Sequence, residues 1–358
     1  MIFCVTLSII LILTGIVIQN NRILAAIQSI WIWLVVGFTN GEMDFAENNL
    51  IYKNTAYAKI SSPSTWLSNL IGNYTNSMGM EYWEYNAVVS AVLILILYWI
   101  ILKNTKKISL FYSLFLIYPL VDSVIQKRFF IAFVFCVISL IAMKNNNIKM
   151  SIIAIICALG FHFSAIILVP YLFMDIILKK HIKVIWMILA LEVYIIFFQR
   201  NLVAIILGDN SAKVTTYMNN NISLKAGLLF VCVQVILVLL TLYIENPNLF
   251  LRNLSINSRE NYIMRINIFS LLFIPLLFMD STFFRFYRII MVVTYTDIGK
   301  AFRGKLLKNS YRYYMGMAYI ILIITFQVMT VNLGEFGWNE VLDTLFKYNQ
   351  VLGGIACY

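Results

Sequence analysis

Long apolar runs recur along this chain and constrain its fold more than any other feature. Hydrophobic residues make up 61% of the 358 residues and charged residues only 12%, whereas about 25% of an average soluble domain is charged. A soluble core could not bury so much apolar surface, so the composition predicts a membrane protein. Interpreting runs of about 17 to 25 residues as spans gives about twelve transmembrane helices. The predicted spans are residues 2–18, 23–39, 86–102, 108–124, 128–143, 147–161, 163–178, 184–199, 224–244, 264–280, 284–299 and 312–332.

The predicted fold class is therefore all-α, a polytopic membrane protein in which residues 1–358 form a single integral-membrane domain. The net charge of +11 does not indicate nucleic-acid binding, because the basic residues are dispersed between apolar runs and form no single stripe. The five cysteines have no CxxC spacing, so they predict neither a metal site nor a disulfide framework. Zinc-ligand spacing, a nucleophile elbow and a glycine-rich phosphate loop are also missing from the sequence, so we expect no cofactor and no metal.

The positions of lysine and arginine predict the orientation of the spans. Most of the 27 basic residues fall in loops on one side, with the tight turns near Lys106 and Lys180 as the clearest cases. By the positive-inside rule this side is cytoplasmic, and both termini then lie outside.

With this orientation the long loops face outward. They are residues 40–85 and 200–223, and residues 333–358 form an outward tail. Residues 44–60 mix aromatic and charged side chains, which predicts an interfacial helix there. Residues 61–79 are rich in Ser, Asn and Gly and are predicted to be irregular.

Three outward hairpins would bring cationic side chains to one membrane surface, with turns near Arg128, at His162 and near Arg285. Arg285 and Arg288 are three residues apart on a predicted helix and so share a face. A guanidinium matches two phosphate oxygens at once, so these arginines with Arg128 could clamp a diphosphate. The alternative is that they extend to the outer lipid headgroups. Lys127 would point away from Arg128 on a helix, so we expect Lys127→Ala to be mild.

Other polar residues leave their roles open. His162 could act as a general base, bind a phosphate or cap a helix end. Glu42 and Asp44 could bind a divalent ion or serve as acid and base, or belong to a solvated acidic loop. Glu192 falls inside a predicted span, where we expect a structural or relay role.

Several of these motifs resemble the EpsG/Wzy group of bacterial polysaccharide polymerases. Arg128–Ala132 is similar to its Arg-Gln-x-x-Ala start of a span, and Gly160–Ala165 contains its His-x-Ser-Ala turn. Phe284–Ile289 resembles the arginine-containing C-terminal span of the group, and Gly41–Phe45 followed by Tyr52 resembles its Gly-x-Asp-Tyr element.

The sequence departs from the group at specific positions. Phe129 replaces the usual Gln, Phe45 replaces the usual Tyr, and no Arg immediately precedes Gly41. These departures bear more on the role of the first outer loop than on that of Arg128 or His162.

The resemblance implies a metal-independent membrane glycosyltransferase with a fold like that of the GT-C enzymes. It would join oligosaccharide repeat units carried on undecaprenyl diphosphate at the outer face of the bacterial cytoplasmic membrane. The implied partners are this lipid-linked oligosaccharide, the bilayer, and the chain-length regulator and flippase of the same pathway. The catalytic candidates are His162, Arg128 and Arg285; the diphosphate-binding candidates are Arg128, Arg285 and Arg288; and the candidates for sugar binding or acid–base chemistry are Glu42, Asp44, Tyr52 and Ser164.

Two other functions remain open at the sequence level. A flippase for the same lipid-linked sugars also commonly has about twelve spans, but it should show paired halves and charges near the midplane. A glycan ligase or acyltransferase would share a diphosphate site with a polymerase, so the sequence discriminates it poorly.

Overall fold

The computed structural model describes residues 1–41, 45–55, 65–180, 224–246, 261–278, 281–302, 310–333 and 337–356. Within these residues the chain is helical, and the prediction of an all-α fold is confirmed for them. They divide into two compact units, the first formed by Met1–Ala165 with Ile323–Tyr358 and the second by Ile166–Leu322. The single integral-membrane domain stays a prediction, and each unit is described by itself.

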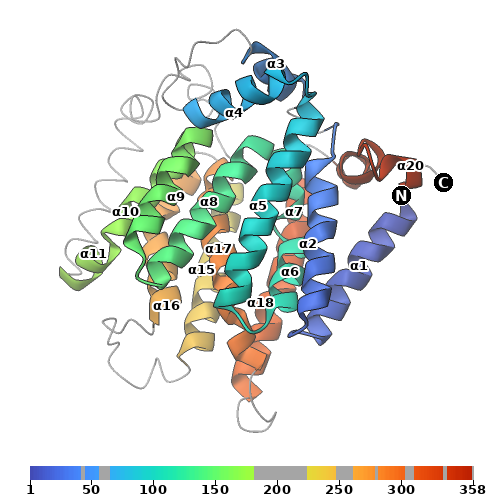
Figure 1. The fold of residues 1–358 in the computed structure, drawn as a ribbon. Coiled ribbons are helices and arrows are strands. Elements are labelled where there is room, and N and C mark those ends of the chain that lie inside the picture. The colour runs from blue at the N-terminus through green and yellow to red at the C-terminus, as the bar shows by residue number, and fades with distance from the viewer. Residues whose placement is uncertain are drawn as a thin grey trace. The chain divides into compact units, whose positions relative to one another are not determined.

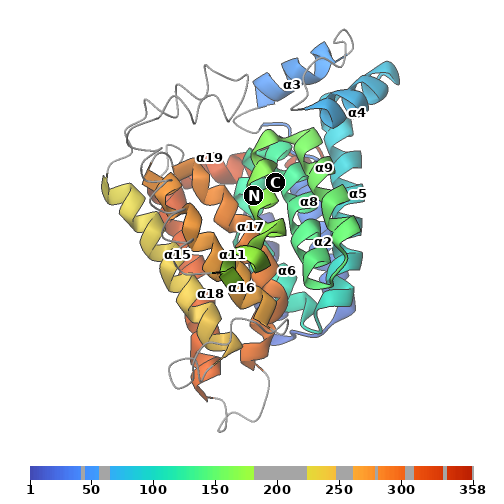
Figure 2. The ribbon, with the colours of Figure 1, turned by 90° about the vertical axis from the view of Figure 1, so that its left-hand side faces the viewer.

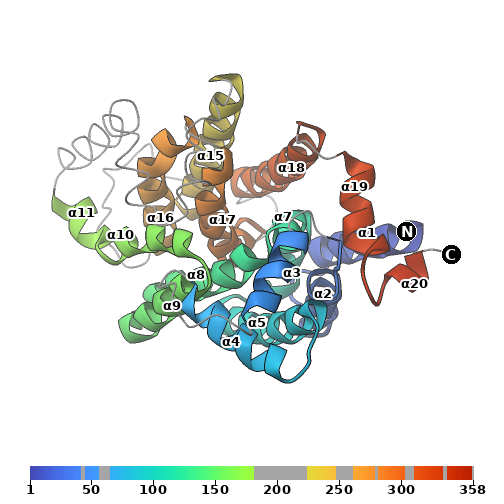
Figure 3. The same cartoon turned by 90° about the horizontal axis from the view of Figure 1, so that it is seen from above.

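Unit 1 is a bundle of helices that run up and down along its length (Figure 1). Its main helices are α1 (Ile2–Val17), α2 (Arg22–Gly37), α5 (Tyr82–Asn104), α6 (Ile108–Ile117), α8 (Lys127–Lys144) and α9 (Ile148–Phe161). Two helices, α3 (Phe45–Asn54) and α4 (Trp66–Ser77), lie across one end of the bundle, and Figure 3 looks down on them. The shorter elements are α7 (Leu120–Ile125), α19 (Trp338–Leu342), a π-helical turn (Asp343–Lys347) and α20 (Gly353–Ala356).

Local capping explains where several of these helices begin. The side chain of Asn21 accepts a backbone N–H bond from the first turn of α2, and Asn147 does the same for α9. Glu81 and Glu84 form a capping box at the start of α5. Because of this box, α5 begins before residue 86, where its span was predicted to start.

The segment predicted as the first outer loop, residues 40–85, is more helical than the sequence predicted. The helix α3 confirms a helix within residues 44–60, and its interfacial location stays a prediction. The prediction that residues 61–79 are irregular is wrong for α4. Apolar residues recur in α4 at helical spacing, and Ile71 packs against the buried cluster of Tyr52, Tyr82 and Tyr85. This packing outweighs the weak helix propensity of the Ser, Asn and Gly residues.

Prolines interrupt two of the predicted spans. The span predicted over residues 108–124 is divided into α6 and α7, because Pro119 lacks the N–H needed to continue the helix. The span predicted over residues 264–280 begins as α16 (Tyr262–Ser270) and continues as a 3₁₀-helix (Leu271–Phe278) that contains Pro275.

The turns between the helices of unit 1 lie at its two ends. Asn145 donates a hydrogen bond of 2.8 Å to Oδ1 of Asn104, which joins the α8–α9 turn to the α5–α6 turn. Exposed Lys106 and Lys149 lie in or beside these turns, at the end opposite α3 and α4 (Figure 1). This alternation agrees with the predicted hairpins, and the orientation in a membrane stays a prediction.

Unit 2 contains α15 (Leu224–Glu245), α16, α17 (Phe284–Ile298) and the first part of α18 (Ser310–Leu333), shown side by side in Figure 2. A 3₁₀-helix (Phe163–Leu168) leads from unit 1 to the short α10 (Val169–Leu172) and α11 (Met174–Lys180). A buried polar network joins α16 to α17: Asn267 donates to Oγ1 of Thr294 at 2.9 Å and accepts from Tyr287 at 3.3 Å. Such satisfied networks fix the register of two apolar helices.

Three described helices are long and apolar enough to cross a membrane: Tyr82–Asn104, Lys225–Glu245 and Tyr311–Asn332. The other predicted spans overlap shorter or interrupted helices, except residues 184–199, which lie outside the described residues. A membrane protein is therefore supported, and the number of twelve spans stays a prediction.

Gly15 allows α1 to pack closely against α2 and α6. A Cβ there would lie 2.1 Å from Ser113 Oγ, 2.3 Å from Gln28 Nε2 and 2.8 Å from the Ser109 carbonyl oxygen. We expect Gly15→Val to destabilise the protein by roughly 2–3 kcal/mol through overpacking. The measurement is the thermal unfolding midpoint in detergent. Gly354→Val is the control, because a Cβ there meets nothing within 4 Å, and equal midpoints for the two variants would contradict this packing.

Candidate functional site

Arg128 lies in the first turn of α8, at the end of unit 1 that α3 and α4 cover. Its Nη2 is 3.7 Å from Oε1 of Glu47 on α3, and the two side chains are 31% and 45% exposed. An ion pair this exposed contributes at most about 1 kcal/mol. A phosphate could therefore replace the carboxylate at the guanidinium with little loss of free energy.

Glu47 is a partner of the candidate site residue Arg128 that the sequence did not single out. It belongs to a short polar helix, and nothing in the spacing of α3 indicates which of its side chains faces α8. Only the packing of α3 across the bundle brings its carboxylate to Arg128.

His162 ends α9 and begins the tight turn into the following 3₁₀-helix, as the sequence predicted. The backbone N–H of Ser164 donates to Nδ1 of His162 at 3.2 Å, and Ser164 Oγ is 2.7 Å from the same atom. A backbone N–H can only donate, so Nδ1 is an acceptor, and the neutral ring carries its proton on Nε2. The imidazole therefore presents a hydrogen-bond donor at Nε2.

Phe129 lies between Arg128 and His162, the two candidates at this end of unit 1. Its ring meets the His162 ring edge to face, with centroids 5.7 Å apart and an interplanar angle of 86°. It follows Arg128 directly in α8, so Arg128 and His162 belong to one end of unit 1. The aromatic ring that replaces the Gln of the EpsG/Wzy pattern thus has a packing role beside His162.

Gly160 positions α4 next to this histidine. A Cβ at Gly160 would lie 2.6 Å from Cβ of Leu67 and 2.9 Å from the ring of Trp66. The missing side chain allows α4 to pack directly on the last turn of α9. The helices α3 and α4 thus contact α8 and α9, the two helices that carry Arg128 and lead into His162.

Tyr52 has a packing role in the structure. Its side chain is buried against Tyr82 and Tyr85, and its hydroxyl donates to the Met80 carbonyl oxygen at 2.9 Å. Burial, with a further contribution from Glu84, raises the pKa of the Tyr52 hydroxyl, so this group stays protonated. Its predicted part in sugar binding or acid–base chemistry stays a prediction, and this burial does not favour it.

Two acidic candidates and one acidic residue of a predicted span belong to parts of the chain that the structure does not describe. Glu42, Asp44 and Glu192 lie outside the described residues. Within the described ranges, no three His, Cys, Asp or Glu side chains lie close enough together to bind a metal ion. Metal independence stays a prediction.

Arg285 and Arg288 lie in unit 2, three residues apart on α17 as predicted. Nε of Arg285 donates to the Thr282 carbonyl oxygen at 2.8 Å, which fixes the direction of this side chain. Arg288 is only 7% exposed. Because Arg128 and His162 belong to unit 1, the meeting of all four side chains stays a prediction.

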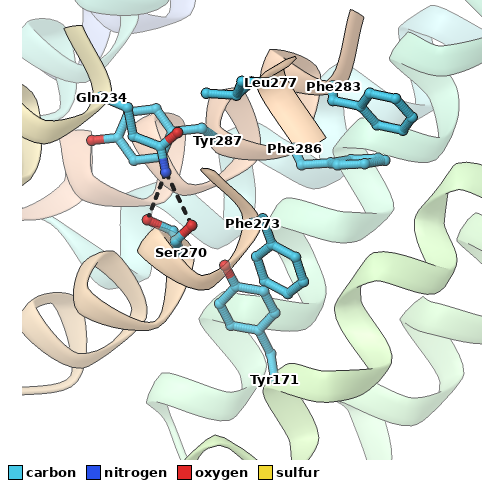
Figure 4. A pocket seen from close by; sticks show the side chains of 8 residues that line it. All are labelled: Tyr171, Gln234, Ser270, Phe273, Leu277, Phe283, Phe286 and Tyr287. Carbon is cyan, nitrogen blue, oxygen red and sulfur yellow. Dashed lines mark hydrogen bonds between the residues drawn. The ribbon is translucent and has the colours of Figure 1, made fainter. Parts of the chain in front are cut away.

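Unit 2 contains a small cavity, and some of its lining residues are neighbours of Arg285 in the sequence. The cavity is too small to be a substrate site. Its volume of about 10 Å³ has room for one water molecule at most. Gln234 donates to the Ser270 carbonyl oxygen at 3.0 Å on its wall (Figure 4). The remaining lining residues are Tyr171, Phe273, Leu277, Phe283, Phe286 and Tyr287.

The apolar helices and the arginine and histidine at the end of unit 1 define a helical membrane protein with a polar site at a helix-bundle end. The profile of the EpsG family matches residues 22–348, which is nearly the whole chain. The chain therefore belongs to the EpsG family, a family of Wzy-type polysaccharide polymerases, and the resemblance drawn from its motifs is confirmed. No match was found among curated proteins or among solved structures.

Proposed function

We propose that this protein polymerises oligosaccharide repeat units carried on undecaprenyl diphosphate, at the outer face of the bacterial cytoplasmic membrane. Membership of the EpsG family supports polysaccharide polymerisation in general. The observation that carries the site is the placement of Arg128, His162 and Ser164 at one end of unit 1, away from the basic turns at Lys106 and Lys149. The proposal includes a multi-pass fold like that of the GT-C enzymes and a metal-independent reaction.

In the proposed reaction a sugar hydroxyl of one lipid-linked unit attacks the anomeric carbon of the growing chain. A new glycosidic bond forms, the bond from that carbon to the diphosphate breaks, and undecaprenyl diphosphate leaves with the bonding electrons. The hydroxyl proton passes to a general base. The leaving group is already activated, so no nucleotide sugar is required.

The proposed role of the cationic side chains is to stabilise charge on the leaving diphosphate. Arg128 would exchange its Glu47 partner for a phosphate oxygen, and His162 would donate from Nε2. Donors fixed where charge develops lower the barrier more than they strengthen ground-state binding. Arg285 and Arg288 would add two more guanidinium groups to the same diphosphate.

The tautomer of His162 predicts how substitutions there behave. We expect His162→Ala to lower chain extension about 10²-fold, because a fixed donor to the developing charge is lost. His162→Gln keeps a side-chain N–H donor and should retain most of the rate that alanine loses. The measurement is extension of a purified lipid-linked repeat unit by the purified protein. Activity in His162→Glu together with loss in His162→Gln would contradict the donor role and favour a base.

A deletion strain separates the proposed function from its alternatives. A polymerase defect leaves single lipid-linked repeat units exposed outside, where glycan-modifying reagents that do not cross the membrane can reach them. A flippase defect traps these units inside. A ligase defect leaves long chains on the lipid, so one analysis of the accumulated glycan distinguishes all three.

A further inference from the structure

We propose that Lys127 is a positioning residue that fixes the first turn of α8, and with it Arg128, to the end of α2. This inference rests on the proposed function of Arg128. It also revises the expectation from the sequence that Lys127→Ala is mild, because that expectation considered only the helix face of Lys127.

Lys127 is buried although it is adjacent to a solvent-accessible arginine. It is only 2% exposed, and its Nζ donates a hydrogen bond to the carbonyl oxygen of Thr39. A buried ammonium persists only when it is well paired, so this contact constrains both partners. Thr39 follows the last turn of α2, where the helix dipole also favours a cation.

The C-terminal segment at Asn349 and Gln350 also bonds to the end of α2. Nδ2 of Asn349 donates to the Leu34 carbonyl oxygen at 2.8 Å, and a β-bridge joins Asn349 to Thr39. The backbone N–H of Gln350 donates to the Phe38 carbonyl oxygen at 2.9 Å. We call Thr39, Lys127 and Asn349 the α2 junction. Because α2, α8 and the C-terminal segment all meet there, the carbonyl of Thr39 has little freedom to move.

The α2 junction is adjacent in sequence to two parts of the proposed site, namely Arg128 and the first outer loop. Arg128 follows Lys127 directly, so a shift of the first turn of α8 shifts the guanidinium. The first outer loop begins immediately after Thr39, at residue 40. A displacement of about 1 Å in a positioned group can lower a rate about 10²-fold. The junction thus sets where Arg128 lies relative to the outer loop.

The test compares Lys127→Met, which keeps length but loses the donor, with Lys127→Arg, which keeps a donor. Purified full-length protein is assayed for extension of a lipid-linked repeat unit, and kcat and KM are determined separately. We expect Lys127→Met to lower kcat about 10²-fold with a small change in KM, and Lys127→Arg to recover most of that loss. Lys149→Met, an exposed lysine at the opposite end of unit 1, is the matched control and should behave as wild type.

A double variant distinguishes positioning from a general structural role. If Lys127 acts through Arg128, Lys127→Met should not further lower the residual rate of Arg128→Ala. Independent multiplication of the two losses, or a wild-type kcat in Lys127→Met, would overturn the inference. Should Lys127→Met fail to accumulate, Asn349→Ala loosens the junction without leaving a gap at Lys127. A loss of about tenfold that disappears in the Arg128→Ala background then supports the inference, and an unchanged rate overturns it.

The outcome for Arg128→Ala alone keeps the two proposals separate. If that variant extends chains normally, the proposed function of the site fails. If it is inactive while Lys127→Met is fully active, only the positioning role fails.

Discussion

Arg128→Ala is expected to lower chain extension about 10²- to 10³-fold while the protein still accumulates in the membrane. If Arg128 binds the leaving diphosphate as proposed, the variant loses a charged donor that contributes about 3–4 kcal/mol to transition-state stabilisation. Its only described ion pair, with Glu47, is exposed and contributes little to stability, so the fold should persist. The measurement is the rate of extension of a lipid-linked repeat unit by purified protein, together with the amount of protein in the membrane fraction.

Two further variants define the origin of that loss. Arg128→Lys keeps the charge but not the two-pronged geometry, so we expect an intermediate rate. Arg22→Ala removes an exposed arginine from the opposite end of unit 1 and should leave extension unchanged. Similar losses in Arg22→Ala and Arg128→Ala would indicate a general effect of charge and would contradict a specific diphosphate contact.

Arg285→Ala is expected to cause a loss of similar size. Arg285 lies one turn from Arg288 on α17, and its bond to the Thr282 carbonyl oxygen holds the guanidinium in one direction. A guanidinium fixed before the substrate arrives loses little entropy on binding, which favours catalysis. The measurement is the same extension assay, with Arg285→Lys as the conservative comparison.

The Arg285 variant also tests whether the two units share one site. If Arg128→Ala is inactive and Arg285→Ala extends chains normally, the diphosphate site is confined to unit 1. If each single variant loses activity and the variant with both substitutions is no slower than expected from one loss alone, the two arginines act on the same diphosphate.

The sequence predicted the helical class and the turns of unit 1 because both depend on local hydropathy. Runs such as residues 128–143 and 147–161 correspond closely to α8 and α9, with the turn at His162 where the shortness of the runs requires it. The prediction from the sequence was wrong for α4. Its Ser, Asn and Gly residues indicate a loop, and the packing of Ile71 on the tyrosine cluster, which stabilises the helix, is not visible in the sequence.

Burial is what the sequence could not supply for the candidate site. Lys127 and Arg128 are adjacent basic residues, but the first is buried and donates to the Thr39 carbonyl oxygen, whereas the second is accessible and pairs with Glu47. Tyr52 fits a family motif, yet its ring belongs to the core. Glu47 carries no local signal at all and becomes a partner of Arg128 only through tertiary packing.

The most direct test of the account is the lipid-linked glycan that accumulates in a strain whose only copy of this protein carries Arg128→Ala. The account predicts single repeat units on undecaprenyl diphosphate, accessible from outside the cell, with few or no long chains. Long chains of normal length, or single units confined to the cytoplasmic side, would contradict an outward-facing polymerase that depends on Arg128.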